Sequence, residues 1–243
     1  MKKLYVVGLG PGDEQNMTGR ALAALEESEV VVGYTAYVDL IRARYPDKAF
    51  LATAMRGEAE RCRMALEAAC AGRTVAVVSS GDAGIYGMAG LIYELAQGYD
   101  PVDIEVVPGV TAACSGAALL GAPLIHDFAV ISLSDLLTPW ELIERRLEAA
   151  GAADFCICLY NPASRRRADY LQRACDILLR SRAPGTVAGL VRNAGRAGET
   201  VRVLTLGELR EARADMFTTV FIGNSQTKNL NGSMVTPRGY RDA

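Results

Sequence analysis

The chain is poor in the residues from which metal sites are built. It has 243 residues but a single histidine, His126, and no two of its six cysteines form a C-x-x-C pair. Structural zinc sites combine such pairs with further cysteine or histidine ligands. The sequence therefore predicts no metal site, and the cysteines are interpreted as small buried side chains in a reducing compartment. They are Cys62, Cys70, Cys114, Cys156, Cys158 and Cys175.

Long uninterrupted apolar segments are also missing. A charge-free stretch covers residues 106–125, but three glycines and two prolines interrupt it, which makes it a poor membrane-spanning helix. The apolar run near the start is short and broken by Gly8 and Gly10, and no small-residue cleavage site follows it. We therefore expect no signal peptide, no membrane partner and a cytoplasmic location.

Neither sign of charge is in large excess, since 26 basic residues face 28 acidic ones. This balance argues against a nucleic-acid partner. Lysine is scarce, however, with four residues against 22 arginines. Arginine binds carboxylates and phosphates through paired hydrogen bonds, although a coding bias explains the total equally well.

Segments of strand length alternate with segments of helix length through the first half of the chain. Strands are predicted at residues 4–7, 30–32, 75–78 and 104–107, and helices at 18–27, 37–45, 58–71, 85–96 and 111–120. Thr18 is a suitable helix N-cap, and Gly72 ends the third helix. This alternation is typical of an α/β layer around a mostly parallel sheet.

The second half shows a different pattern. Strands are predicted at residues 128–132, 155–160, 187–191, 200–205 and 219–222, and helices at 140–149, 167–179 and 206–211. The last strands are too close together for helical crossovers, which indicates a mixed sheet. We therefore expect two α/β domains, residues 1–122 and 128–243, joined by the stretch 121–127.

The first strand runs into a glycine-rich turn, Val6-Val-Gly-Leu-Gly-Pro-Gly-Asp13. A dinucleotide-binding fingerprint needs a third glycine where this chain has Asp13, and Pro11 removes one backbone donor. No lysine follows the glycines, so the turn is not a phosphate-binding P-loop either. A purely structural turn is still an open interpretation of this motif alone.

Two more glycine-rich turns follow later strands of the same predicted sheet. They are Ser79-Ser-Gly-Asp-Ala-Gly-Ile-Tyr-Gly-Met88 and Val107-Pro-Gly-Val-Thr-Ala-Ala113. Ligands of open α/β sheets bind outside the carboxyl ends of the strands. Three such turns in one domain therefore predict a small-molecule site.

The order and spacing of these turns resemble the tetrapyrrole methylases, which use S-adenosylmethionine as methyl donor. Residues 32–37, 126–128, 131–140, 160–162 and 234–240 narrow the resemblance to the C17-methyltransferases that act on precorrin-3 in cobalamin biosynthesis. Ala83, in place of a commoner proline, and the tail Thr236-Pro-Arg-Gly-Tyr240 look more like the cobalt-first branch. The resemblance covers essentially the whole chain.

This resemblance implies an S-adenosylmethionine-dependent C-methyltransferase that converts cobalt-precorrin-3 or precorrin-3B to (cobalt-)precorrin-4, with contraction of the macrocycle. Cobalt would enter only as part of the substrate, and the protein would be a homodimer. Donor-binding residues implied by the family lie in a cleft between the two domains. They are Pro11, Gly81, Asp82, Gly84, Ile85, Thr111, Ala112, Tyr160, Asn161, Arg192, Asn193 and Ala194.

Some residues keep two interpretations. Asp82 is either a donor ligand or the N-cap of the helix at 85–96. Arg165, Arg166 and Arg167 either bind substrate carboxylates or form an exposed helix start. His126 is either a structural residue or a residue that assists ring contraction or holds the substrate for it. An imidazole suits the proton transfer of contraction near neutral pH.

Other functions fit the sequence less well. The nearest alternative is a tetrapyrrole C-methyltransferase acting at C11 or C20, which would share the donor turns. A methylase of ribosomal RNA or of a modified protein histidine is more distant. A nucleotide-dependent oxidoreductase conflicts with the incomplete fingerprint, and a non-enzymatic binding module leaves the three turns unexplained.

Overall fold

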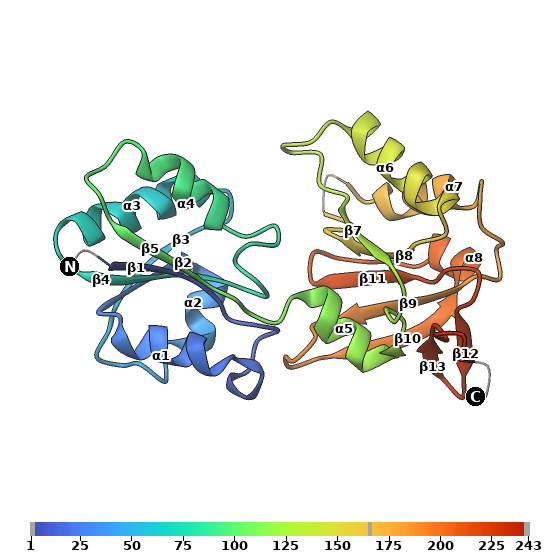
Figure 1. Cartoon of the computed structure of the whole chain (residues 1–243), viewed down its shortest axis with the longest axis horizontal. Coiled ribbons are helices and arrows are strands. Elements are labelled where there is room, and N and C mark those ends of the chain that lie inside the picture. The colour runs from blue at the N-terminus through green and yellow to red at the C-terminus, as the bar shows by residue number, and fades with distance from the viewer. Residues whose placement is uncertain (1–2, 165–166, 241–243) are drawn as a thin grey trace. The chain divides into compact units, whose positions relative to one another are not determined.

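The structure, a computed structural model, describes residues 3–164 and 167–240. It divides into two compact units, residues 1–112 and 113–243 (Figure 1). The division falls after the first residue of helix α5 (Ala112–Leu120), so the rest of that helix belongs to the second unit, whereas the sequence analysis placed the helix in the first domain. The composition of a small-residue helix does not reveal which sheet it packs against.

A five-stranded parallel sheet forms the centre of the first unit, with the order β3-β2-β4-β1-β5. Its strands are β1 (Lys3–Gly8), β2 (Val30–Tyr34), β3 (Ala49–Thr53), β4 (Thr74–Ser79) and β5 (Asp103–Val107). Its helices are the short 3-10 helix η1 (Glu14–Asn16), α1 (Gly19–Glu27), α2 (Thr35–Ile41), α3 (Glu58–Cys70) and α4 (Ala89–Ala96). Because all five strands are parallel, their carboxyl ends lie at one edge.

Both faces of this sheet are buried, which explains its continuous apolar strands. Leu4 and Val6 of β1 pack with α3 and α4, and Tyr5 and Val7 pack with α1 and α2 on the opposite face. Figure 1 shows these two helical layers on either side of the first sheet. The predicted parallel α/β layer is confirmed.

Local signals place most helix ends of this unit correctly. The Thr18 hydroxyl accepts a hydrogen bond from the N–H of Ala21, as an N-cap does, and Gly72 follows α3 with a left-handed φ of 91°. Helix α4, however, begins at Ala89 rather than at residue 85. Gly84 and Gly87 favour a loop there, and Tyr86 between them has a φ of 53°.

The second unit contains a mixed five-stranded sheet with the order β10-β9-β11-β8-β7. Its strands are β7 (Phe128–Ser132), β8 (Cys156–Tyr160), β9 (Val187–Arg192), β10 (Thr200–Thr205) and β11 (Thr218–Ile222). Strands β7 and β8 are parallel, and β11 is antiparallel to both β8 and β9. Strands β7, β8 and β9 therefore run in the same direction, and their carboxyl ends share one edge. The predicted mixed sheet is confirmed.

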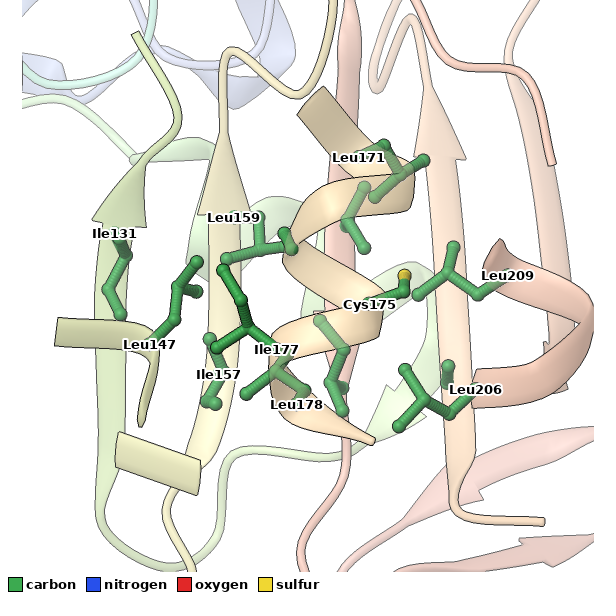
Figure 2. Close-up of a cluster of buried hydrophobic side chains, with 14 of the residues drawn as sticks. Ile131, Leu147, Ile157, Leu159, Leu171, Cys175, Ile177, Leu178, Leu206 and Leu209 are labelled. Atoms are coloured by element: carbon green, nitrogen blue, oxygen red, sulfur yellow. The ribbon is translucent and has the colours of Figure 1, made fainter. Parts of the chain in front are cut away.

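Helices cover both faces of this sheet as well. The larger core lies under α6 (Trp140–Ala152), α7 (Tyr170–Leu178) and α8 (Leu206–Arg210). In Figure 2, Leu147, Leu171 and Leu178 from these helices meet Ile157 and Leu159 of β8. Helix α5 covers the other face, where Gly116 lets it approach Phe221 closely.

A small third sheet joins the end of the chain to the segment after α5. It contains β6 (Gly121–Ala122), β12 (Lys228–Leu230) and β13 (Ser233–Val235). The buried Thr236 then donates a hydrogen bond from its hydroxyl to the Pro123 carbonyl, at 2.7 Å. Strands β3, β6, β12 and β13 were not predicted, because they are short or half-exposed and lack a regular apolar pattern.

None of the helices within the described ranges has both the length and the apolar character needed to span a bilayer. In the same ranges, no three histidine, cysteine, aspartate or glutamate side chains gather in a way that would hold a metal ion.

Candidate active site

The three glycine-rich turns of the first unit meet at the carboxyl edge of its sheet. They follow β1, β4 and β5, and β1 lies between the other two strands. Gly10 and Gly81 exchange two backbone hydrogen bonds, of 3.0 and 2.8 Å. The Leu9 N–H also donates to the Ser79 carbonyl at 2.8 Å. The turns that the sequence placed at one edge are therefore in direct contact.

Glycine is required at this junction for two reasons. Gly10 and Gly81 have left-handed φ angles of 70° and 68°, which side chains rarely tolerate. Gly8 and Gly109 permit backbone contact, since a Cβ on Gly109 would lie 2.2 Å from the Gly81 carbonyl oxygen. A Cβ on Gly8 would lie 2.7 Å from the Gly109 nitrogen. The junction is thus a close-packed backbone assembly.

Asp82 fastens two of these turns together. One carboxylate oxygen accepts the Gly84 N–H at 2.8 Å, and the other accepts the Gly109 N–H at 3.0 Å. Because α4 begins only at Ala89, after Met88 as N-cap, the interpretation of Asp82 as a helix cap is wrong. Each carboxylate oxygen has a second lone pair, so Asp82 can still accept hydrogen bonds from a ligand.

Apolar side chains lie exposed on these turns. Ile85, Tyr86 and Val110 are 40%, 57% and 36% exposed, respectively. Pro11 is buried, and Asp13 caps helix η1 by accepting the Asn16 N–H at 2.9 Å. The turns therefore combine apolar surface, backbone polar groups and two carboxylates, those of Asp13 and Asp82.

The charges at the turns indicate the kind of ligand they suit. The stretches 6–13, 79–88 and 107–113 contain no lysine, arginine or histidine, while Asp13 and Asp82 are acidic. A site for nucleotide phosphates normally supplies cationic side chains or a helix N-terminus with free N–H groups. A cationic sulfonium donor with an adenosine moiety fits this acidic and apolar surface better.

Of the residues predicted to bind the donor, seven lie on these turns of the first unit. They are Pro11, Gly81, Asp82, Gly84, Ile85, Thr111 and Ala112. A Cβ on Gly81 would lie 3.7 Å from the Ala112 nitrogen and from the Thr111 Cα, so the second and third turns are in contact there too.

The remaining predicted donor residues lie at the carboxyl edge of the second sheet. Tyr160 ends β8, and its hydroxyl accepts the Ala113 N–H at 2.7 Å, which ties β8 to the start of α5. Asn161 follows with a φ of 53°, and its amide donates to the Ser132 hydroxyl at 2.9 Å. The hydrogen bond from Asn161 to Ser132 joins the ends of β7 and β8.

Arg192, Asn193 and Ala194 form the turn after β9. The Arg192 guanidinium donates to Asp215 at 2.7 Å, and Asn193 has a φ of 53°. Partial burial alone would raise the pKa of Asp215, but hydrogen bonds from Arg192, the Thr218 hydroxyl and a backbone N–H hold that pKa below its usual range. Arg192 is thus engaged with a carboxylate of its own chain.

The predicted substrate residues are only partly described. Arg165 and Arg166 lie outside the described residues. Arg167 does not start a helix, since α7 begins at Tyr170. Its Nε donates to the Ser164 hydroxyl at 3.1 Å, and its Nη1 lies 3.8 Å from Asp135. The alternative of a solvated helix start is therefore wrong for Arg167.

His126 lies between β6 and β7 and contacts the end of the chain. Its Nε2 is 3.0 Å from the Pro237 carbonyl oxygen. A carbonyl oxygen only accepts hydrogen bonds, so Nε2 carries a proton and Nδ1 is the basic nitrogen of the neutral ring. The imidazole is half-buried, and the Pro237 carbonyl anchors it through Nε2.

Sequence reasoning missed the link between Asp135 and α7. Asp135 accepts a hydrogen bond from the Tyr170 hydroxyl at 2.6 Å, besides its proximity to Arg167. The two partners are more than 30 positions away in the chain, and no local pattern connects them. The only sequence feature that could have indicated this link was the stretch 131–140, which contains Asp135. It contributed to the family resemblance, but none of its residues was given a role.

The comparisons with known proteins agree with these features. The family model described as "Tetrapyrrole (Corrin/Porphyrin) Methylases" matches residues 3–210. The chain is 51% identical to a probable cobalt-factor III C(17)-methyltransferase of Salmonella typhimurium, covering 98% of this chain and 99% of that protein. It is 42% identical to a precorrin-3B C(17)-methyltransferase of a Sinorhizobium species, covering 99% and 98%.

A solved structure, that of the methyltransferase CobJ, has the same fold. It superposes with a TM-score of 0.89 and 38% identity over 97% of this chain and 99% of CobJ. This coverage includes most of both units, and the family model's residues 3–210 include all the turns described above. The resemblance inferred from the strand-end turns is thereby confirmed, and the alternative of a nucleotide-dependent oxidoreductase is set aside. This chain belongs to the family of tetrapyrrole (corrin/porphyrin) methylases.

Proposed function

We propose that this chain transfers a methyl group from S-adenosylmethionine to C17 of cobalt-precorrin-3 or precorrin-3B, with contraction of the ring to (cobalt-)precorrin-4. The observation that carries the proposal is the 51% identity, over nearly the full length of both chains, to a protein named as a probable cobalt-factor III C(17)-methyltransferase. Identity at this level extends over both units and not over the donor turns alone.

The donor-binding role of the first unit rests on the geometry of its turns. When bound, S-adenosylmethionine supplies an electrophilic methyl group, whose transfer to carbon neutralises the sulfonium. The residues proposed to hold it are those of the β1, β4 and β5 turns, with Asp82 accepting hydrogen bonds from its polar groups and Ile85 covering its apolar surface. Such a transfer depends on positioning and exclusion of water, which these turns can provide without strong acids.

Binding of the donor can be tested without any tetrapyrrole. Thermal shift with S-adenosylhomocysteine should raise the melting temperature, whereas NAD and ATP should leave it unchanged. A ligand that binds only the folded state stabilises it in proportion to the logarithm of its concentration. Stabilisation by NAD or ATP but not by S-adenosylhomocysteine would contradict the proposed donor.

His126 is the proposed proton-transfer group for ring contraction. Its Nδ1 carries the lone pair while Nε2 is held by the Pro237 carbonyl, so the imidazole is oriented and still basic. Contraction requires proton movement at an oxygenated bridge carbon or at a lactone-forming acetate, unlike simple methyl transfer. An imidazole is the side chain suited to that transfer near neutral pH.

Two variants separate this role from the anchoring of the chain end. His126→Gln can keep a donor to the Pro237 carbonyl but has no basic nitrogen, whereas His126→Ala loses both. We expect both variants to bind S-adenosylhomocysteine normally and to lose contracted product, with methylated but uncontracted material accumulating. Loss of contraction in His126→Ala alone would assign His126 to anchoring.

Several finer expectations stay predictions within this proposal. Contact of Arg165, Arg166 and Arg167 with substrate carboxylates predicts a higher KM for the tetrapyrrole, at unchanged donor affinity, when all three are replaced by glutamine. Analytical ultracentrifugation tests the implied homodimer. A cytoplasmic location and the absence of nucleic-acid and membrane partners are likewise still to be measured.

A further inference from the structure

The segment between β7 and α6, residues 133–139, exposes two adjacent leucines. Leu137 is 98% exposed and Leu136 is 61% exposed, more than any other leucine among the described large apolar side chains. Single exposed apolar residues are common on protein surfaces. Two neighbouring leucines at one loop present a larger apolar surface that no described residue covers.

The rest of this loop is firmly attached to the second unit. Leu133 is fully buried, and its N–H donates to the Tyr160 carbonyl at 2.9 Å. Asp135 accepts the Tyr170 hydroxyl at 2.6 Å, and this hydrogen bond raises the pKa of Tyr170, so the hydroxyl keeps its proton. The Tyr170 ring also packs on Trp140, with centroids 4.6 Å apart. The leucines therefore project from a loop that is held in place at both ends.

The loop lies at the same edge as the predicted site residues of this unit. Strands β7, β8 and β9 run in one direction, so the loop after Ser132 emerges beside the turns that begin at Tyr160 and Arg192. The hydrogen bond from the Asn161 amide to the Ser132 hydroxyl connects the first two of these turns directly.

Basic side chains accompany the leucines. Arg167 lies 3.8 Å from Asp135 of the loop, and the Arg173 guanidinium lies 3.9 Å from the ring centroid of Trp140. One guanidinium group thus contacts the residue before the leucine pair, and the other contacts Trp140, the first residue after the loop. A tetrapyrrole has the matching character, with a flat apolar macrocycle and acetate and propionate groups around its rim.

We propose that Leu136 and Leu137 contact the face of the tetrapyrrole macrocycle, and that Asp135, Tyr170 and Arg167 hold the loop in the position that this contact requires. The inference rests on the proposed function, of which it specifies the substrate-contacting segment. Leu136 and Leu137 are the contacting residues, and Asp135 and Tyr170 are positioning residues that act through them. A loop held in its binding conformation loses less entropy on binding.

The double variant Leu136→Ala/Leu137→Ala tests the contact. Its affinity for cobalt-precorrin-3 can be measured without turnover through the fluorescence of Trp140, the chain's single tryptophan, which a tetrapyrrole bound at this loop is expected to quench. We expect both the dissociation constant and the KM for this substrate to rise about tenfold, the lower end of what loss of apolar contacts does in enzyme pockets. Affinity for S-adenosylhomocysteine and the melting temperature should not change, since both side chains are exposed.

Leu230→Ala is the matched control. Leu230 is 48% exposed and lies on β12, in the third sheet of the same unit. Its truncation removes the same atoms from an exposed leucine outside the loop, so the KM for the tetrapyrrole should stay at the wild-type value.

Tyr170→Phe tests the positioning role. It removes the hydroxyl that binds Asp135 but keeps the ring that packs on Trp140. We expect a severalfold increase in KM for the tetrapyrrole with kcat and donor affinity unchanged, a separation that a general loss of stability would not produce.

The outcomes distinguish this inference from the proposed function. If the wild-type protein methylates no tetrapyrrole, the proposed function fails. If it is active and the double variant keeps the wild-type KM and dissociation constant, the loop does not contact the substrate and the inference is overturned. The same holds if the double variant changes only the oligomeric state, because the leucines would then bind a second copy of the chain.

Discussion

Replacing Asp82 by alanine should loosen the junction of the donor turns and weaken donor binding together. Asp82 accepts two backbone N–H groups, from Gly84 in its own turn and from Gly109 in the turn after β5. A hydrogen bond from a neutral donor to a charged acceptor contributes about 1.5–3 kcal/mol, and the lower end applies at a half-exposed site. Loss of both therefore costs about 3 kcal/mol of unfolding free energy.

This loss is large enough to measure by two independent methods. For a chain of this size, each kcal/mol lowers the melting temperature by roughly 2–4 °C, so a decrease of about 6–12 °C is expected. Titration calorimetry with S-adenosylhomocysteine should show at least about a tenfold lower affinity, the equivalent of one hydrogen bond of about 1.4 kcal/mol. Asp82→Asn should fall between alanine and wild type, because an amide keeps one acceptor oxygen but turns its NH2 group toward the second N–H.

Glu29 offers a matched control at the opposite edge of the same sheet. It also accepts a backbone N–H, from Thr74 at 2.9 Å, and it pairs with Arg73. Glu29→Ala should lower the melting temperature somewhat while leaving the affinity for S-adenosylhomocysteine unchanged. If Asp82→Ala matches wild type in donor affinity, Asp82 is not part of the donor site. Unchanged thermal stability would refute the role of its two hydrogen bonds.

Three further predictions follow from particular contacts. Gly109→Ala places a Cβ 2.2 Å from the Gly81 carbonyl oxygen, which the close-packed junction cannot accommodate, so calorimetry should detect no binding of S-adenosylhomocysteine. Gly90→Ala is the control, because no atom lies within 4 Å of its Cβ, and it should bind S-adenosylhomocysteine normally. Burial raises the pKa of Cys62 to about 11 and that of Cys175 to about 12. A thiol reagent at pH 8 should therefore label the exposed Cys114 first and the buried thiols only after denaturation. Rapid labelling of Cys62 in the native protein would refute this prediction. The pKa of Asp215 is lowered in the folded state, so its stabilising effect is present above about pH 4 and is lost as the pH falls through the lowered pKa. Urea unfolding at a series of pH values should therefore show a weaker loss of stability in acid for Asp215→Asn than for wild type, and parallel curves would contradict the assignment.

The position of the donor turns could be predicted because it depends on a regular feature of the fold. Parallel strands with helical crossovers bring their carboxyl ends to one edge, so three glycine-rich turns in the sequence were sufficient to locate the junction. The sequence did not indicate that β1 lies between β4 and β5, and this order places Gly109 beside Gly8 and within reach of Asp82.

Contacts between distant segments account for the expectations that failed. Aspartate is a common helix N-cap, which is why Asp82 was considered as the cap of α4. Its carboxylate accepts the N–H of Gly109, a residue of another turn that the local sequence does not place beside it. The alternative of an exposed helix start for Arg167 was based on its position in a run of three arginines. Its partner Asp135 lies in the loop before α6, more than 30 positions away in the chain. Helix α5 was assigned to the first domain because nothing in its small residues shows that Gly116 packs against Phe221.

The site of methylation is the central claim, and isotope labelling tests it most directly. The protein should be incubated anaerobically with S-adenosylmethionine carrying a 13C-labelled methyl group, once with cobalt-precorrin-3 and once with precorrin-3B. NMR of the isolated product should place the label on C17 of a contracted macrocycle with at least one of the two substrates, and mass spectrometry should show one added methyl group. A label at C11 or C20 would contradict the proposed function, and so would the absence of methylation with both substrates.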